Sequence, residues 1–158
     1  MSNNIYVGWD SREDIAYQVC EHSIRRRTNQ NSVNVSPLKQ SELREQKLYW
    51  REQDKLSSTE FTITRFLVPH LNKFTGWAAF CDCDMVWRSD PSELFSQVDD
   101  SKAVMVVKHD YTPQEGTKMD GQLQLPYPRK NWSSMILWNC SHPKNKALDL
   151  KTVNTASP

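Results

Sequence analysis

The chain has 158 residues, of which 37% are hydrophobic and 25% charged, and its formal net charge is +1. This length fits a single domain, residues 1–158, and six Trp, five Tyr and five Phe are enough to anchor a core, which excludes intrinsic disorder. The even balance of charge argues against bulk capture of nucleic acid or an anionic membrane. No apolar run approaches the roughly 18 residues of a membrane-spanning helix.

The first 38 residues predict a strand, a helix and a second strand. Residues 5–9 form a short apolar run typical of a buried strand. Ser11, with Asp14 three positions later, resembles a capping box and predicts the start of a helix that ends in three arginines, 25–27. Apolar residues spaced for one helical face follow at positions 15, 16, 19, 20 and 24. A weak strand at 33–35, ended by Pro37, completes a unit that indicates a parallel sheet.

The rest of the chain continues this alternation. Residues 39–57 are the most polar stretch and predict a short helix with a surface excursion. The expected elements that follow are a helix from Ser58 or Thr59 to near Pro69, strands at 77–81, 103–107 and 133–138, a helical turn at 92–95 and a helix start at 144–150. Residues 110–130 have no period, and so long a loop in a small domain is often functional. No further helix or strand is expected after residue 150.

The sharpest feature is a pair of carboxylates directly after an apolar strand. Asp82 and Asp84 stand two positions apart, a spacing that places both side chains on one face of an extended chain. In open α/β sheets, ligands bind beyond the carboxyl ends of the strands. Two neighbouring carboxylates repel each other unless a cation holds them, and Mg²⁺ or Mn²⁺ prefers such oxygen ligands. The spacing therefore predicts a metal site, against the alternative of a solvated pair of Asp residues in a turn.

Several other polar residues are candidates for contact with a ligand. Asp10 and Arg12 follow the first predicted strand at the same end of the sheet and could meet a nucleotide base or ribose, or else be ordinary turn residues. Arg65 could reach a phosphate or a sugar, and Arg129 and Lys130 could meet diphosphate charge, although each is also explained as a surface cation.

The cysteines do not suggest a metal site. Cys81 and Cys83 are separated by one residue, where zinc sites usually have two or more, and Cys20 and Cys140 lie far away in the sequence. The N-terminus has no signal-like apolar stretch, so we expect a cytoplasmic protein with free, buried thiols.

Three segments in order resemble the central block of GT-A glycosyltransferases, and of the family 8-like group in particular. They are residues 62–71, with an Arg and a following Pro, residues 77–84, a strand ending in D-x-D, and residues 90–95. The opening residues 6–10 resemble that group's first strand, and residues 131–139 resemble its later strand. The resemblance implies a GT-A (Rossmann-like) α/β fold, with a mixed, mostly parallel sheet flanked by helices.

The same resemblance implies an activity and a set of roles. The chain would transfer a sugar from a nucleotide-diphosphate donor, most commonly a UDP-sugar, to a glycan, lipid or protein acceptor. Asp82 and Asp84 would hold Mn²⁺ or Mg²⁺ on the diphosphate, Asp10 would lie at the nucleotide, and Arg65 would face the donor sugar or its phosphate.

Two departures from the family pattern qualify these roles. Residues 132–134 read Trp-Ser-Ser where the family has Asn-Ser-Gly. The family's later metal-binding His and much of its acceptor pocket have no counterpart, so we expect a sheet incomplete at the C-terminus, and a chain that is truncated or that works with a second copy or a partner subunit.

Two other functions stay open. One is a non-catalytic remnant of the same fold that binds a nucleotide or a partner. The other is a haloacid dehalogenase-type phosphatase, in which Asp82 would be the nucleophile and Asp84 the general acid.

Overall fold

The structure, a computed structural model, describes residues 3–28, 32–52, 57–110, 116–117, 123–124 and 132–157. Its strands are β1 (Asn3–Gly8), β2 (Val33–Leu38), β3 (Trp77–Cys81), β4 (Val104–Val106), β5 (Gly116–Thr117), β6 (Leu123–Gln124) and β7 (Met135–Asn139). Its α-helices are α1 (Asp14–Arg25), α2 (Gln40–Glu45), α3 (Val68–Leu71), α4 (Pro91–Phe95) and α5 (Leu150–Thr155). Three 3₁₀ helices complete the set, η1 (Thr64–Leu67), η2 (Trp132–Ser134) and η3 (Pro143–Ala147).

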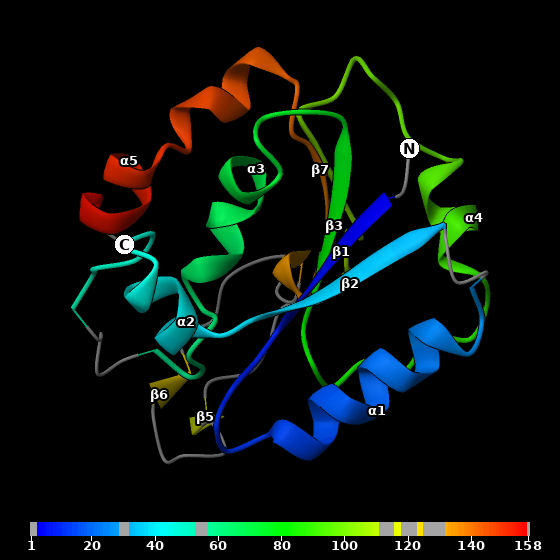
Figure 1. Ribbon diagram of the computed structural model, residues 1–158, viewed down its shortest axis with the longest axis horizontal. Helices are drawn as coiled ribbons and strands as arrows, with labels where there is room; N and C mark the ends of the chain where they lie inside the picture. Colours follow the sequence, from blue (N-terminus) through cyan, green and yellow to red (C-terminus); the bar gives the residue numbers. More distant parts are fainter. Residues whose placement is uncertain are drawn as a thin grey trace.

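A mixed five-stranded sheet forms the centre of the fold, with the strand order β2-β1-β3-β7-β4. β1 pairs in parallel with β2 and with β3, whereas β7 is antiparallel to both β3 and β4. Four of the five strands therefore point the same way. Helices cover both faces, with α1 and α4 on one side and α2, α3 and α5 on the other (Figure 1). The mostly parallel α/β sheet expected from the sequence is confirmed.

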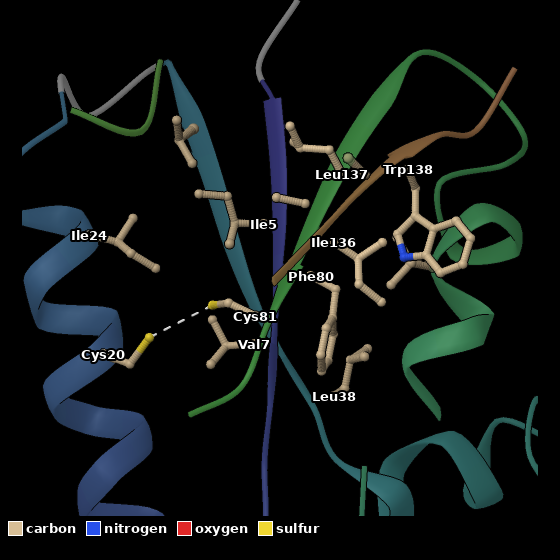
Figure 2. Close-up of a cluster of buried hydrophobic side chains, with 14 of the residues drawn as sticks. Ile5, Val7, Cys20, Ile24, Leu38, Phe80, Cys81, Ile136, Leu137 and Trp138 are labelled. Carbon is tan, nitrogen blue, oxygen red and sulfur yellow. Dashed lines mark hydrogen bonds between the residues drawn. The ribbon is translucent and has the colours of Figure 1, made fainter. Parts of the chain in front are cut away.

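The side chains of the central strands alternate between these two helical layers. Val7 and Cys81 point toward α1, where Cys20 and Ile24 meet them, while Phe80 and Ile136 point toward the layer that contains α3 (Figure 2). All of these residues belong to one buried hydrophobic core. The four cysteines are buried and unpaired, as expected.

A second, smaller core lies under α5. Its buried members are Leu43, Tyr49, Leu67 and Val153. The expectation that no element follows residue 150 is therefore wrong, because α5 closes onto this cluster. Asp149 caps that helix by accepting a hydrogen bond from the Thr152 amide at 2.7 Å.

Three other expectations are corrected. Pro37 does not end β2, which continues to Leu38, because β2 is an edge strand where a missing amide donor costs little. The helix expected from Ser58 begins only at Thr64, and Pro69 lies inside α3 at its first turn, where its ring is tolerated. Within residues 110–130, the described pairs form the small antiparallel ladder of β5 and β6.

In the described part of the chain, no helix is long and apolar enough to cross a membrane.

Candidate functional site

The candidate site lies where β1 and β3 end side by side. Val7 pairs with Cys81 in the parallel register, so the turn after Gly8 and the turn after Cys81 leave the same edge of the sheet. That edge is where open α/β sheets bind their ligands. It brings the segments of Asp10 and Asp82 together, as the sequence predicted.

Asp10 is fully buried and organises the first turn. Its Oδ1 accepts hydrogen bonds from the Arg12 amide at 3.0 Å and from Arg12 Nε at 2.9 Å, and its Oδ2 accepts from Arg12 Nη2 at 2.9 Å and from the Glu60 amide at 3.1 Å. The hydrogen bonds from the Arg12 side chain lower the pKa of Asp10 to about 2. Asp10 therefore faces the protein interior and fixes Arg12 and Glu60. In this geometry the expected role of Asp10 at the nucleotide would be exerted through these two residues and not by direct contact.

Ser11 does not cap the first helix, contrary to the sequence prediction. Its hydroxyl donates to Glu60 Oε1 at 2.5 Å, and α1 begins at Asp14 with no side-chain cap. Asp14 instead accepts from Trp9 Nε1 at 2.8 Å. A partner 49 positions away competes for the hydroxyl, which the local capping pattern does not reveal.

Arg65 is a buried cation at the entrance to η1. Its guanidinium carbon lies 4.8 Å from the ring centroid of Phe80 and 5.4 Å from that of Phe61. Its Nε donates to the Phe61 carbonyl at 3.3 Å, and its Nη1 donates to the Ser133 carbonyl at 2.7 Å. The two rings and the two carbonyls fix the orientation of the charge.

Asp82 faces this cation. Its Oδ1 lies 3.2 Å from Arg65 Nη1, and the exposed fractions of the two side chains are 20% and 9%. The same Oδ1 is buried and has no aligned hydrogen-bond donor. Burial raises the pKa of Asp82, and the neighbouring Arg65 and a hydrogen bond from the Ser134 side chain partly offset this rise. An under-satisfied carboxylate oxygen at a ligand-binding edge is well suited to a divalent cation.

Asp84 is exposed two residues further on, beyond the turn. The negative charges of Asp84 and Glu13 both add to the rise in the pKa of Asp82. Glu13 also accepts a hydrogen bond from Cys83 Sγ at 3.3 Å. Within the described residues, no three His, Cys, Asp or Glu side chains gather closely enough to hold a metal ion. A cation here would have Asp82 and Asp84 as its protein ligands, together with oxygens from elsewhere.

A polar cavity of about 300 Å³ opens beside the first turn. The residues that line it include Ser11, Arg12, Tyr49, Arg51, Thr59, Glu60, Thr62 and Ile63. Thr62 and Ile63 directly precede η1, so the cavity and the Arg65–Asp82 pair lie at the two ends of one short segment. A cavity of this volume is in the range of small-molecule sites.

Sequence reasoning missed some residues of this edge. Glu60 and Glu13 act through contacts with residues 49 and 70 positions away, and no local pattern marks them. Phe61 and Phe80 were visible as apolar residues, but their place around Arg65 depends on the fold. The expected roles of Arg129 and Lys130 lie outside the described residues.

Solved structures with the same architecture cover almost the whole chain. The WbbM bifunctional glycosyltransferase superposes with a TM-score of 0.61 at 13% identity, covering 96% of this chain and 34% of that one. The chain has a glycosyltransferase fold. Mouse xyloside xylosyltransferase 1 (TM-score 0.56, 10% identity, 97% and 74%) and GlyE of Streptococcus pneumoniae TIGR4 (0.53, 13%, 98% and 37%) share it.

Sequence comparison gives a near relative of greater length. Protein CDI of Arabidopsis thaliana is 57% identical over 151 residues, which cover 96% of this chain but 58% of that protein. The chain thus spans less than two thirds of the relative it matches. No family model matches the chain.

Proposed function

We propose that the chain is the donor-binding part of a glycosyltransferase of the GT-A, family 8-like type, which takes a nucleoside diphosphate sugar and transfers the sugar to a glycan, lipid or protein acceptor. The observation that carries this proposal is Asp82, whose Oδ1 lies buried and under-satisfied at the carboxyl end of β3, 3.2 Å from Arg65, in a glycosyltransferase fold. A UDP-sugar is the donor we test first.

Asp82 and Asp84 fit Mn²⁺ or Mg²⁺ as carboxylate ligands, and the diphosphate and water would complete the coordination. Such a cation stabilises the negative charge that develops on the leaving nucleoside diphosphate. Because the pKa of Asp82 is raised by burial, protons compete for this carboxylate, and we expect metal-dependent binding to strengthen as the pH rises through that pKa.

Arg65 and Arg12 supply the positive charge of the site. Arg65 favours the ionised form of Asp82 and holds a fixed guanidinium next to the expected position of the donor phosphate or sugar. Arg12 is held by its hydrogen bonds to Asp10, and it lines the cavity that would bind the nucleoside. Arg129 and Lys130 remain proposed contacts to the diphosphate.

The decisive experiment is calorimetric titration of UDP into the folded chain, with Mn²⁺ and with EDTA. We expect Mn²⁺-dependent binding that is lost in Asp82→Asn/Asp84→Asn. The matched control is Asp99→Asn/Asp100→Asn, which makes the same charge change on exposed residues before β4, at the opposite edge of the sheet. Binding that is equal in both double variants, or no binding of UDP, GDP, ADP or CDP to a folded chain, would overturn the proposal.

A second readout separates the alternatives. Metal-dependent binding without hydrolysis of the donor sugar would favour the non-catalytic nucleotide-binding remnant. Hydrolysis of a simple phosphomonoester that Asp82→Asn abolishes would favour the phosphatase.

A further inference from the structure

Asn154 is a buried residue of α5 that lies far in sequence from Asp10 and Asp82, whose edge of the sheet is the proposed donor edge. Its side-chain Oδ1 accepts hydrogen bonds from the Trp50 amide at 2.7 Å and the Arg51 amide at 3.0 Å. Its Nδ2 donates to the Leu150 carbonyl at 2.8 Å and the Leu48 carbonyl at 3.2 Å. All four hydrogen-bonding positions of the amide are used, and three of them bind the backbone of residues 48–51.

Further contacts hold the same segment against α5 and α2. Arg51 Nη1 donates to the Ala156 carbonyl at 2.6 Å and the Val153 carbonyl at 3.3 Å, at the carboxyl end of α5. From α2, Arg44 Nη2 donates to the Arg51 carbonyl, and the Arg44 guanidinium carbon lies 4.9 Å from the Tyr49 ring centroid. Residues 48–51 have no regular secondary structure. The amides of Leu48 and Tyr49 donate to the Leu43 carbonyl, and the side-chain contacts of Asn154, Arg51 and Arg44 hold the rest of the segment.

This segment is also a wall of the polar cavity. Tyr49, Arg51 and the following Glu52 line it, together with Arg12 and Ser11 from the donor edge. Removal of the Asn154 amide would leave the partly buried amides of Trp50 and Arg51 without their acceptor, and the backbone would shift to satisfy them. The cavity wall moves when that backbone moves.

We propose that Asn154 is a positioning residue through which α5 fixes the wall of the nucleoside cavity. The proposal rests on the proposed donor site. It assigns to α5 a role in recognition of the nucleoside, separate from the diphosphate and metal ligands on β3. Loss of Asn154 therefore weakens binding of a nucleoside diphosphate and leaves binding of inorganic pyrophosphate with Mn²⁺ unchanged.

The chain offers a matched control in Asn145. This asparagine is equally buried, and its Nδ2 donates to the Ala103 and Asn139 carbonyls, both at 2.7 Å. It lies in η3, and the two carbonyls that it binds belong to β7 and the segment before β4, away from the cavity lining. Asn145→Ala therefore removes a buried side-chain amide that bonds to backbone carbonyls without touching the wall.

The experiment compares wild type, Asn154→Ala, Asn145→Ala and the milder Asn154→Ser at a temperature where circular dichroism shows all of them folded. The ligands are the nucleoside diphosphate that wild type binds best and inorganic pyrophosphate, each with Mn²⁺. We expect Kd for the nucleotide to rise about tenfold in Asn154→Ala, less in Asn154→Ser, and by less than about twofold in Asn145→Ala. Kd for pyrophosphate should stay within about twofold in every variant.

The outcomes separate the two proposals. If wild type binds nucleotide and Asn154→Ala binds it equally well, or if Asn145→Ala loses as much affinity, the positioning role is wrong while the donor site stands. If Asn154→Ala does not fold, Asn154→Ser against Asn145→Ala decides in the same way. If wild type binds neither nucleotide nor pyrophosphate, the donor site itself is wrong and the role of Asn154 falls with it.

Discussion

The two carboxylates at the proposed donor edge, Asp10 and Asp82, differ in how their negative charge is compensated. The carboxylate of Asp10 receives four hydrogen bonds, two of them from the Arg12 guanidinium, so it is ionised and satisfied. The carboxylate of Asp82 is close to a cation but lacks an aligned donor on Oδ1. The first arrangement builds a turn, while the second leaves one carboxylate oxygen without an aligned donor, and this contrast favours Asp82 over Asp10 as a ligand residue of the proposed donor site.

The buried, satisfied Asp10 predicts a pH dependence of stability. Its folded pKa is lowered to about 2, below the unfolded value near 3.9, so its contribution is fully present above pH 4 and is lost as the pH falls toward 2. We expect Asp10→Asn to lower the free energy of unfolding at pH 7 by about 1 to 2 kcal/mol, because the exposed end of Arg12 is screened by water. Urea denaturation between pH 7 and pH 3 measures the difference in unfolding free energy between wild type and Asp10→Asn.

The difference between wild type and Asp10→Asn should shrink steadily below pH 4. The exposed Asp110, changed to Asn, serves as the control and should show no comparable difference at any pH. A gap between wild type and Asp10→Asn that stays constant down to pH 3 would mean that the carboxylate charge is not what stabilises the turn.

At this scale, the sequence identified residues whose signal is local. Asp82 and Asp84 directly follow an apolar strand, and this pattern is visible in consecutive residues of the sequence. It could not identify Glu60 or Asn154, because each acts on residues 49 or more positions away. Their chemistry is ordinary for a surface Glu and a helical Asn until the fold supplies the partner.

Among the elements, the strands were the most predictable. Residues 77–81 are apolar throughout, and β3 has the expected bounds because it is covered on both faces. The helices were less so. In α1, Ile15 was expected on the buried face but is 73% exposed, while Tyr17 and Ser23 are buried. The Trp87 amide donates to the Ser23 hydroxyl, a tertiary contact on the buried face that the apolar spacing does not reveal.

Gly8, the last residue of β1, shows how closely the segment before η1 approaches the sheet. A Cβ built there would lie 2.6 Å from the Phe61 ring, a distance that forces the ring to move. Phe61 in turn packs against Phe80 and Arg65. We expect Gly8→Ala to cost about 1 to 3 kcal/mol of unfolding free energy and to weaken Mn²⁺-dependent nucleotide binding, because Arg65 shifts with the ring.

The compensating variant for this prediction is Gly8→Ala/Phe61→Leu, in which the smaller side chain makes room for the new methyl group. Chemical denaturation and titration calorimetry should find part of the stability restored relative to Gly8→Ala alone. If Gly8→Ala is as stable as wild type, the approach of Phe61 to the strand is looser than the structure indicates.

The whole molecule is divided between two cores of unequal size. The main core surrounds β1, β3 and β7, whereas the smaller one joins α2, η1 and α5 under the cavity wall. The smaller core has fewer buried apolar residues than the main core. Short helices and side-chain-to-backbone hydrogen bonds therefore supply more of what holds it together. The proposed donor edge thus has one side on the main core, which carries Asp82, and one side that depends on α5.

This division predicts two levels of protection against hydrogen exchange. The Trp50 and Arg51 amides are protected by Asn154, so they should exchange together with the Val153 amide when α5 detaches. We expect this opening at a free energy at least about 2 kcal/mol below that of the β3 amides, which need global unfolding. Native-state hydrogen exchange at increasing urea concentration measures both opening free energies. Asn154→Ala should lower only the opening free energy of the α5 region. Exchange of all these amides at one common free energy would mean that the two cores unfold as a single unit, and that α5 cannot adjust the cavity wall independently of the sheet.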